Sequence, residues 1–253
     1  MTTALLLVFS LVASVAVCGN AAALEANQAS NFQLKILSPD GKRTIGSTRF
    51  IVTRDNSSEE IKGETTYIDG EHDSESERLQ VGSPESTPRL DSYEHSFFNA
   101  DGTLQMVDTL DVKSGVASCT SHSAGKINAR KSRLEVPGDS FAGASELMMV
   151  VERLRHGIRE IRFHAFACVP GPRIFSVEAS LPDRSTHWLL YPGELVRLDM
   201  QPDLGVLNLL IAPFMPKMDA WFNPNDNWNY VGGEFDRYFR GPHVLTVRVP
   251  SPD

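Results

Sequence analysis

The sequence lacks a basic stripe, metal-ligand spacings and, after its first residues, any long apolar run. Its 253 residues include 24 Lys and Arg against 32 Asp and Glu, for a net charge of −8. Phosphate neutralisation needs clustered Lys and Arg, so no nucleic-acid partner is expected. The three cysteines lie far apart and no two of the seven histidines have ligand spacing, so we expect no metal and no cofactor. No transmembrane span is expected either.

Catalytic motifs are missing as well. Gly138-Asp139-Ser140-Phe141 is similar to the nucleophile block of the GDSL-type lipases and esterases. However, Asn225-Asp226 lacks the glycine of that family's second block, and Asp183 and His187 lie four residues apart instead of three. A turn followed by a helix N-cap explains the same four residues. We therefore predict no catalytic residues and favour a protein that is not an enzyme over the alternative, a hydrolase.

The start of the chain has the pattern of a signal peptide. An apolar run over residues 4–17 is followed by Ala21-Ala22-Ala23, a cleavage site of small residues. This predicts a signal peptide over residues 1–23 and export to the periplasm or the extracellular space. No Lys or Arg precedes the run, so a buried N-terminal helix is the alternative. Lipid anchoring through Cys18 is not expected, because Val17 stands where lipoprotein processing needs a small residue.

Alternation of apolar and polar residues, typical of half-buried strands, covers most of residues 24–253. It is clearest in the second half, where tight turns containing Pro separate four segments: 161–168, 173–181, 186–191 and 195–201. Strands joined by short turns pair antiparallel, because parallel strands need long crossovers. The sequence therefore predicts one mainly β domain, an antiparallel meander curled into a half-open barrel.

Three segments depart from this alternation. An apolar stripe followed by Gly157 predicts a helix near residues 140–156. A short helical segment is predicted near residues 206–214. Between Asp55 and Glu94 the chain carries twelve Asp and Glu against three Lys and Arg, and residues 71–88 are rich in Ser, Glu and Pro. We interpret residues 71–88 as a disordered acidic loop.

Cleavage after residue 23 would leave two cysteines, Cys119 and Cys168. In an oxidising compartment two cysteines are most simply a disulfide. Two buried free thiols are the alternative.

An aromatic segment near the end of the chain supplies the candidate binding residues. Trp221, Phe222, Trp228 and Tyr230 are interleaved with amide side chains. Such side chains stack on sugars or line the mouth of an apolar pocket. The alternative is that they plug the end of the barrel as ordinary core.

The order of elements over residues 31–249, a long meander with one helix partway, resembles exported bacterial proteins of lipocalin-like or lipoprotein-carrier-like shape. The resemblance implies a half-open barrel whose cavity holds an acyl chain or another apolar ligand. It transfers no site residues. The expected function is therefore binding of a hydrophobic ligand such as a lipid. The alternative is a cell-envelope interaction or assembly protein with no small-molecule ligand.

Overall fold

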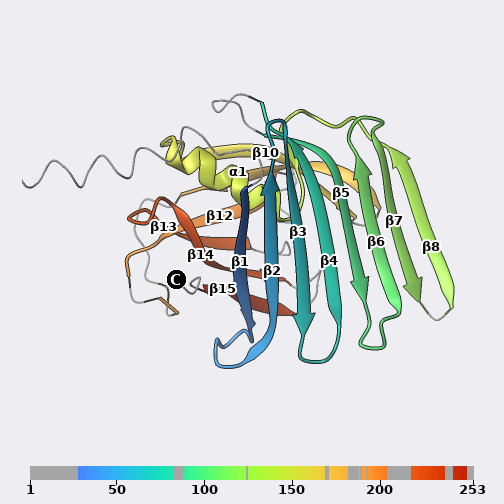
Figure 1. Cartoon of the computed structure of the whole chain (residues 1–253), viewed down its shortest axis with the longest axis horizontal. Helices are drawn as coiled ribbons and strands as arrows, with labels where there is room; N and C mark the ends of the chain where they lie inside the picture. Colours follow the sequence, from blue (N-terminus) through green and yellow to red (C-terminus); the bar gives the residue numbers. More distant parts are fainter. Residues whose placement is uncertain are drawn as a thin grey trace, which may run out of the picture.

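Fifteen strands and one helix make up the described part of the chain, and all the strands belong to one sheet (Figure 1). The computed structural model describes residues 28–82, 88–123, 125–168, 171–181, 188, 190–191, 193–203, 218–236 and 242–249. The predicted signal peptide over residues 1–23 and the predicted helical segment near residues 206–214 lie outside these ranges.

The first half of the chain is a meander of eight strands in which each strand pairs antiparallel with the next. Tight turns with glycine at positive φ, such as the one at Gly102 (φ 80), reverse the chain between strands. The strands are β1 (Gln28–Leu37), β2 (Thr44–Arg54), β3 (Ser58–Tyr67), β4 (His72–Gln80), β5 (Arg89–Phe98), β6 (Leu104–Asp111), β7 (Val116–Ser123) and β8 (Lys126–Arg133).

The second half contributes the helix and the remaining strands. The last strand pairs with the first, so the two halves join in the middle of the sheet. Only the short pairing of β9 with β10 is parallel among the described pairs. These elements are β9 (Ser140–Phe141), α1 (Ala144–Arg155), β10 (Glu160–Cys168), β11 (Pro172–Ser180), β12 (Val196–Asp203), β13 (Met218–Asn223), β14 (Asn229–Asp236) and β15 (His243–Val249).

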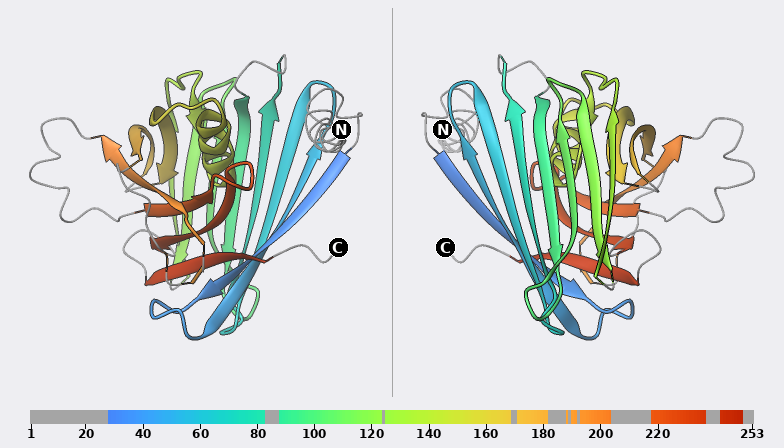
Figure 2. Two further views of the ribbon diagram at one scale, coloured as in Figure 1. Left: turned by 90° about the vertical axis from the view of Figure 1, so that its left-hand side faces the viewer. Right: turned by 90° about the vertical axis from the view of Figure 1, so that its right-hand side faces the viewer.

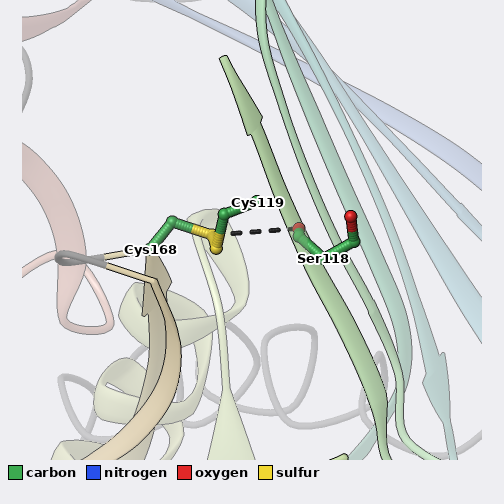
Figure 3. The surroundings of a disulfide bond; sticks show 3 residues. All are labelled: Ser118, Cys119 and Cys168. Atoms are coloured by element: carbon green, nitrogen blue, oxygen red, sulfur yellow. Dashed lines mark hydrogen bonds between the residues drawn. A yellow bond between two sulfur atoms is a disulfide. The ribbon is translucent and has the colours of Figure 1, made fainter. Parts of the chain in front are cut away.

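The sheet curls so strongly that strands near its two ends come into contact. Cys119 on β7 and Cys168 on β10 form a disulfide with a Cα–Cα distance of 5.7 Å (Figure 3). Close by, the rings of Tyr93 and Phe166 meet edge to face with their centroids 5.8 Å apart. The edge strands β8 and β9 do not pair, so the curl stays open. The predicted antiparallel, half-open barrel and the predicted disulfide are both confirmed.

The helix α1 lies on the concave side of the curl, where it packs against both halves of the sheet (Figure 2). Its apolar stripe, with Met149, Val150 and Leu154 buried, faces the sheet. Burial of that stripe stabilises this 12-residue helix, which would be only marginally stable in isolation. The helix predicted near residues 140–156 is therefore confirmed, with β9 in place of its first residues. No helix in the described part of the chain is long and apolar enough to cross a membrane.

The prediction of a disordered loop over residues 71–88 was wrong for most of that segment. His72–Gln80 forms β4, which pairs along its whole length with β3 and β5. Acidic residues stand at inward positions of this strand, so its composition resembled that of a solvated loop. Residues 83–87 lie outside the described part.

Of the strand predicted at residues 186–191, only Trp188, Leu190 and Tyr191 lie in the described part, and none of the three is in a strand. β11 pairs directly with β12. Trp188 stacks instead on Trp221, on the convex face of the sheet, with ring centroids 4.8 Å apart. The apolar side chain of Trp188 therefore covers part of the convex face.

Candidate functional site

The concave face has an apolar region, formed by inward side chains of β1, β2, β10–β14 and α1. Its centre is fully buried; Phe163 and Phe222, for example, are 1% and 0% exposed. Other apolar side chains that pack against this centre are only partly buried. They are Phe32, Phe50, Leu147, Val151, Ile158, Phe175, Leu181, Met218, Trp228 and Phe235.

The same face has an acidic region beside α1, formed by Asp73, Glu75, Glu77, His95, Asp108 and Glu146. Strand register explains the grouping: Glu75 lies opposite His95, which lies opposite Asp108, all on the inner face. Glu146 comes from the first turn of α1. These residues were not predicted from the sequence, although the spacing of two between Asp73, Glu75 and Glu77 is typical of one face of a strand.

The acidic region binds the N-terminus of α1. The backbone N–H of Ala144 donates to Glu75 Oε1 at 2.8 Å. The N–H of Ser145 donates to Glu77 Oε1 and Oε2 at 3.1 and 3.2 Å. These bonds satisfy N–H groups that have no partner within the helix, and the helix dipole favours carboxylates at this end. The acidic region therefore attaches α1 to the sheet.

Burial shifts several of these groups toward their neutral forms. It raises the pKa of Glu146 to about 8, with a further contribution from Glu75. Burial also raises the pKa of Glu77, and the neighbouring Glu75 raises it further. The pKa of Asp108 rises to about 6 by burial, against the opposing effect of His95. Near neutral pH, Glu146 therefore holds a proton and its carboxyl group can donate as well as accept a hydrogen bond, while Glu77 is shifted toward its neutral form.

The other end of α1 is attached to the β13–β14 hairpin. Arg155 Nε donates to the carbonyl oxygen of Asn227 at 3.0 Å. Asn227 and Trp228 both have left-handed backbone (φ 49 and 58), which a bulky residue rarely adopts. Packing of the Trp228 side chain into the apolar region compensates this strain.

The four predicted aromatic residues do not share one face. Phe222 and Tyr230 are core residues of the apolar region, where the Tyr230 hydroxyl lies 2.7 Å from Thr246 Oγ1. Trp228 packs at the edge of the same region. Trp221 points to the convex face, because neighbouring residues on a strand point to opposite sides. The structure brings Phe222, Trp228 and Tyr230 together and separates Trp221 from them.

A pocket of about 1030 Å³ opens at the rim of the curl, where β3 begins and β4 ends. We call it the rim pocket. Three arginines from three elements line it: Arg78, Arg89 and Arg153. The remaining lining residues are Ser57, Ser58, Gln80, Val81, Gly82, Asp91, Gly138 and Asp139.

Within the described residues, one group has the spacing of metal ligands: Asp108, Cys119 and Cys168. The two sulfurs are joined in the disulfide and so offer no thiolate. This group is therefore not a metal site.

No family model matches the chain, and no curated protein matches it. Among solved structures, the chain is similar to a crystal structure described as a β-barrel-like protein of Domain of Unknown Function DUF1849 from Brucella abortus. The identity is 6%, the match covers 88% of this chain and 96% of that chain, and the TM-score is 0.45. No function is transferred from this likeness.

Proposed function

We propose that the protein is an exported, non-enzymatic binding protein that takes up a hydrophobic chain, such as the acyl chain of a lipid, between α1 and the apolar region. The observation that best supports this proposal is that part of the apolar region is exposed. Aromatic side chains such as Phe50, Phe175 and Trp228 pack against the buried centre of this region, yet remain partly accessible. Apolar surface of this kind is stabilised by burial against an apolar ligand.

The way α1 is held supports a role as a movable cover. Glycines with positive φ flank the helix, Gly143 (φ 53) and Gly157 (φ 75), so the chain changes direction at both ends. The polar attachments described above lie at the two ends of α1. Between them the contacts are apolar and include the flexible side chains of Met148 and Met149. A hydrophobic chain can replace such contacts with similar ones.

The disulfide fits export, because disulfides persist in oxidising compartments. It also holds β7 against β10, so the curl of the sheet is kept while α1 moves. We place the protein in the periplasm or the extracellular space as part of the same proposal.

The tryptophans allow a direct test. Of the three in the chain, Trp188 and Trp221 stack on the convex face, and Trp228 alone lies on the concave face. A brominated stearic acid quenches only a tryptophan that it contacts. We expect it to quench part of the emission of the delipidated protein, and to quench none of the emission of Trp228→Phe.

Trp228→Phe is a matched control, because it keeps an aromatic side chain and both convex-face tryptophans. Equal quenching in the two proteins would place the ligand outside the concave face. No quenching, together with no bound fatty acid in equilibrium dialysis, would reject lipid binding. That outcome would favour an envelope interaction or assembly protein without a ligand.

A further inference from the structure

We infer that β8, the edge strand at one end of the sheet, is a docking site for an extended acidic segment of another protein, which adds to the sheet as a further strand. The inference concerns the outer edge of the sheet and does not depend on ligand binding at the concave face. It names a kind of partner that the proposed function does not include.

The outer edge of β8 offers unpaired backbone. β8 pairs with β7 on one side and forms the right-hand end of the sheet in Figure 1, and no other described strand pairs with it. The backbone N–H of Leu134 donates to the carbonyl oxygen of Gly115 at 2.7 Å, which sets the alternation of hydrogen bonds along β7 and β8. The N–H and C=O groups of residues 127, 129, 131 and 133 therefore point away from β7.

The side chains of β8 are accessible on both faces. Seven of its eight residues are exposed, and Ile127 is 66% exposed. Strand addition uses an edge of this kind: main-chain hydrogen bonds supply affinity, and the side chains of the edge strand supply specificity. The opposite end of the sheet is not equivalent, because β9 has only two residues and both are buried.

β8 is also basic. Four of its eight residues are Lys or Arg and none is acidic, in a chain whose net charge is −8. Arg130 lies opposite Cys119, which points across the curl to β10, so Arg130 and Lys126 lie on the concave side. Lys131 and Arg133 lie on the convex side. Within the described residues, none of the four forms an ion pair.

The sheet supplies no counter-charge to the two convex-side cations. Their partners on β7 are Ser118, opposite Lys131, and Val116, opposite Arg133. A strand added at the outer edge places one side chain directly opposite each cation. Pairs of opposite charge in these positions stabilise a sheet and pairs of like charge destabilise it, so an acidic strand fits this edge.

The same charges disfavour a second copy of this chain as the partner. Antiparallel pairing of β8 with β8 of another copy would join two strands that each carry four cations and no acidic residue. Cations on edge strands are a common means of preventing such pairing. They leave the edge open to an acidic strand, so they act for specificity as well as against self-association.

Register predicts the side chains that the partner needs. An antiparallel strand that faces residues 133, 131 and 127 carries acidic side chains at two alternate positions. Four residues further on it carries an apolar side chain, which covers Ile127. The peptide Thr-Glu-Thr-Glu-Thr-Val-Thr-Ile-Thr has this pattern and is the probe.

The test measures amide hydrogen exchange by NMR with and without saturating peptide. In the free protein the N–H groups of residues 127, 129, 131 and 133 should exchange fast, and those of residues 128, 130 and 132, which are bonded to β7, should exchange slowly. The peptide should slow the first set about tenfold or more. Attachment by charge alone does not produce this alternation.

A charge variant tests the choice of partner. Lys131→Gln/Arg133→Gln should bind the labelled peptide about fivefold more weakly in fluorescence anisotropy, because two cross-strand charge pairs are lost. A peptide with Gln in place of both Glu residues should bind the variant and the wild type equally. The matched control is Lys42→Gln/Arg43→Gln, which makes the same change in charge at exposed positions of the β1–β2 turn and should not weaken binding.

Three results would overturn the inference. The first is that the four outward amides already exchange slowly in the free protein, because the edge would then be covered. The second is that the acidic peptide does not slow them, or binds no better than its Gln counterpart. The third is that phosphatidylglycerol vesicles bind the wild type better than Lys131→Gln/Arg133→Gln without alternate protection of β8, since the basic strand would then face a membrane. The quenching of Trp228 by a brominated fatty acid tests the proposed function separately.

Discussion

The apolar and acidic regions share one concave face but are stabilised in opposite ways. The apolar region gains free energy by burying side chains such as Phe163, 1% exposed, and Phe222, 0% exposed. The acidic region places carboxyl groups where charge is disfavoured, and Glu77 is likewise only 1% exposed. It persists because its carboxyl groups take up protons or bind the N-terminus of α1.

This difference indicates that the two regions have different roles in the molecule. The apolar region holds the fold together and, under the proposed function, is where the ligand binds. The acidic region contributes less to net stability, but it sets how firmly the first turn of α1 is attached. Substitutions in the two regions should therefore have unlike consequences, both in size and in their dependence on pH.

The largest difference should come from removing one side chain in each region. Phe163→Ala leaves a cavity beside Phe141 and should lower the free energy of unfolding by about 3–5 kcal/mol. Asp108→Ala should be close to neutral, because Asp108 Oδ1 is buried with no hydrogen-bond partner in the described residues. Urea denaturation measures both. Equal losses would contradict the division between the regions.

Loss of the disulfide should have the next largest effect. Cys119 and Cys168 are 49 residues apart, and in the chain-entropy model a loop of this length corresponds to about 4 kcal/mol. Cys119→Ser/Cys168→Ser should therefore lower the melting temperature to a similar degree as reduction of the wild type. A thiol reductant added to the double variant is the control. A reductant that leaves the wild-type melting temperature unchanged would contradict the prediction.

The acidic region should make stability depend on pH. The pKa of Glu146 is raised from 4.5 to about 8, so its contribution is complete below about pH 4.5 and is lost as pH rises through about 8. Glu146→Gln should match the wild type near pH 8 or exceed it, and should remove about 1–3 kcal/mol of the decline between pH 5 and pH 9. Glu152→Gln, on the polar side of α1, is the control. An unchanged pH profile would show that Glu146 is solvated.

The smallest effect concerns the contact between the acidic region and the helix. A Cβ at Gly143 would collide with Glu75 Oε1, whereas one at Gly157 would meet nothing within 4 Å. Both glycines have positive φ, and Gly143 also has ψ −130, outside the left-handed helical region, which adds to the backbone strain of alanine there. Gly143→Ala should therefore be less stable than Gly157→Ala by about 1 kcal/mol in urea denaturation. Equal stability would show that Glu75 moves aside freely.

The fold could be predicted from sequence wherever apolar residues alternate with polar ones. The residues 161–168 and 195–201 show this pattern, and the structure has strands β10 and β12 there. The pairing of Cys119 with Cys168 was also accessible, because the expected cleavage after residue 23 would leave two cysteines and therefore one choice. Residues 72–80 were not accessible in this way, since their inward positions are acidic and alternation of apolar residues is absent.

The candidate site was only partly accessible for a related reason. Periodicity along one strand does not show which side chains meet across strands. Glu75, His95 and Asp108 come from three strands, and Glu146 comes from a helix, so their grouping depends on register and on the docking of α1. The arginines of the rim pocket are likewise separated by up to 75 residues in sequence.

The pairing of β1 with β15 has a consequence for how the sheet assembles. Gln33 lies opposite Val249, 216 residues later, so the middle of the sheet depends on contacts of very high sequence separation. Hairpins from β1 to β8 close short loops, whereas this pairing closes nearly the whole chain and carries the largest loop entropy. In a chain made from its N-terminus, β1 therefore keeps an unpaired edge until the final strand is present. Such an edge is a template for pairing with other chains, which makes loss of the last strand a route to aggregation.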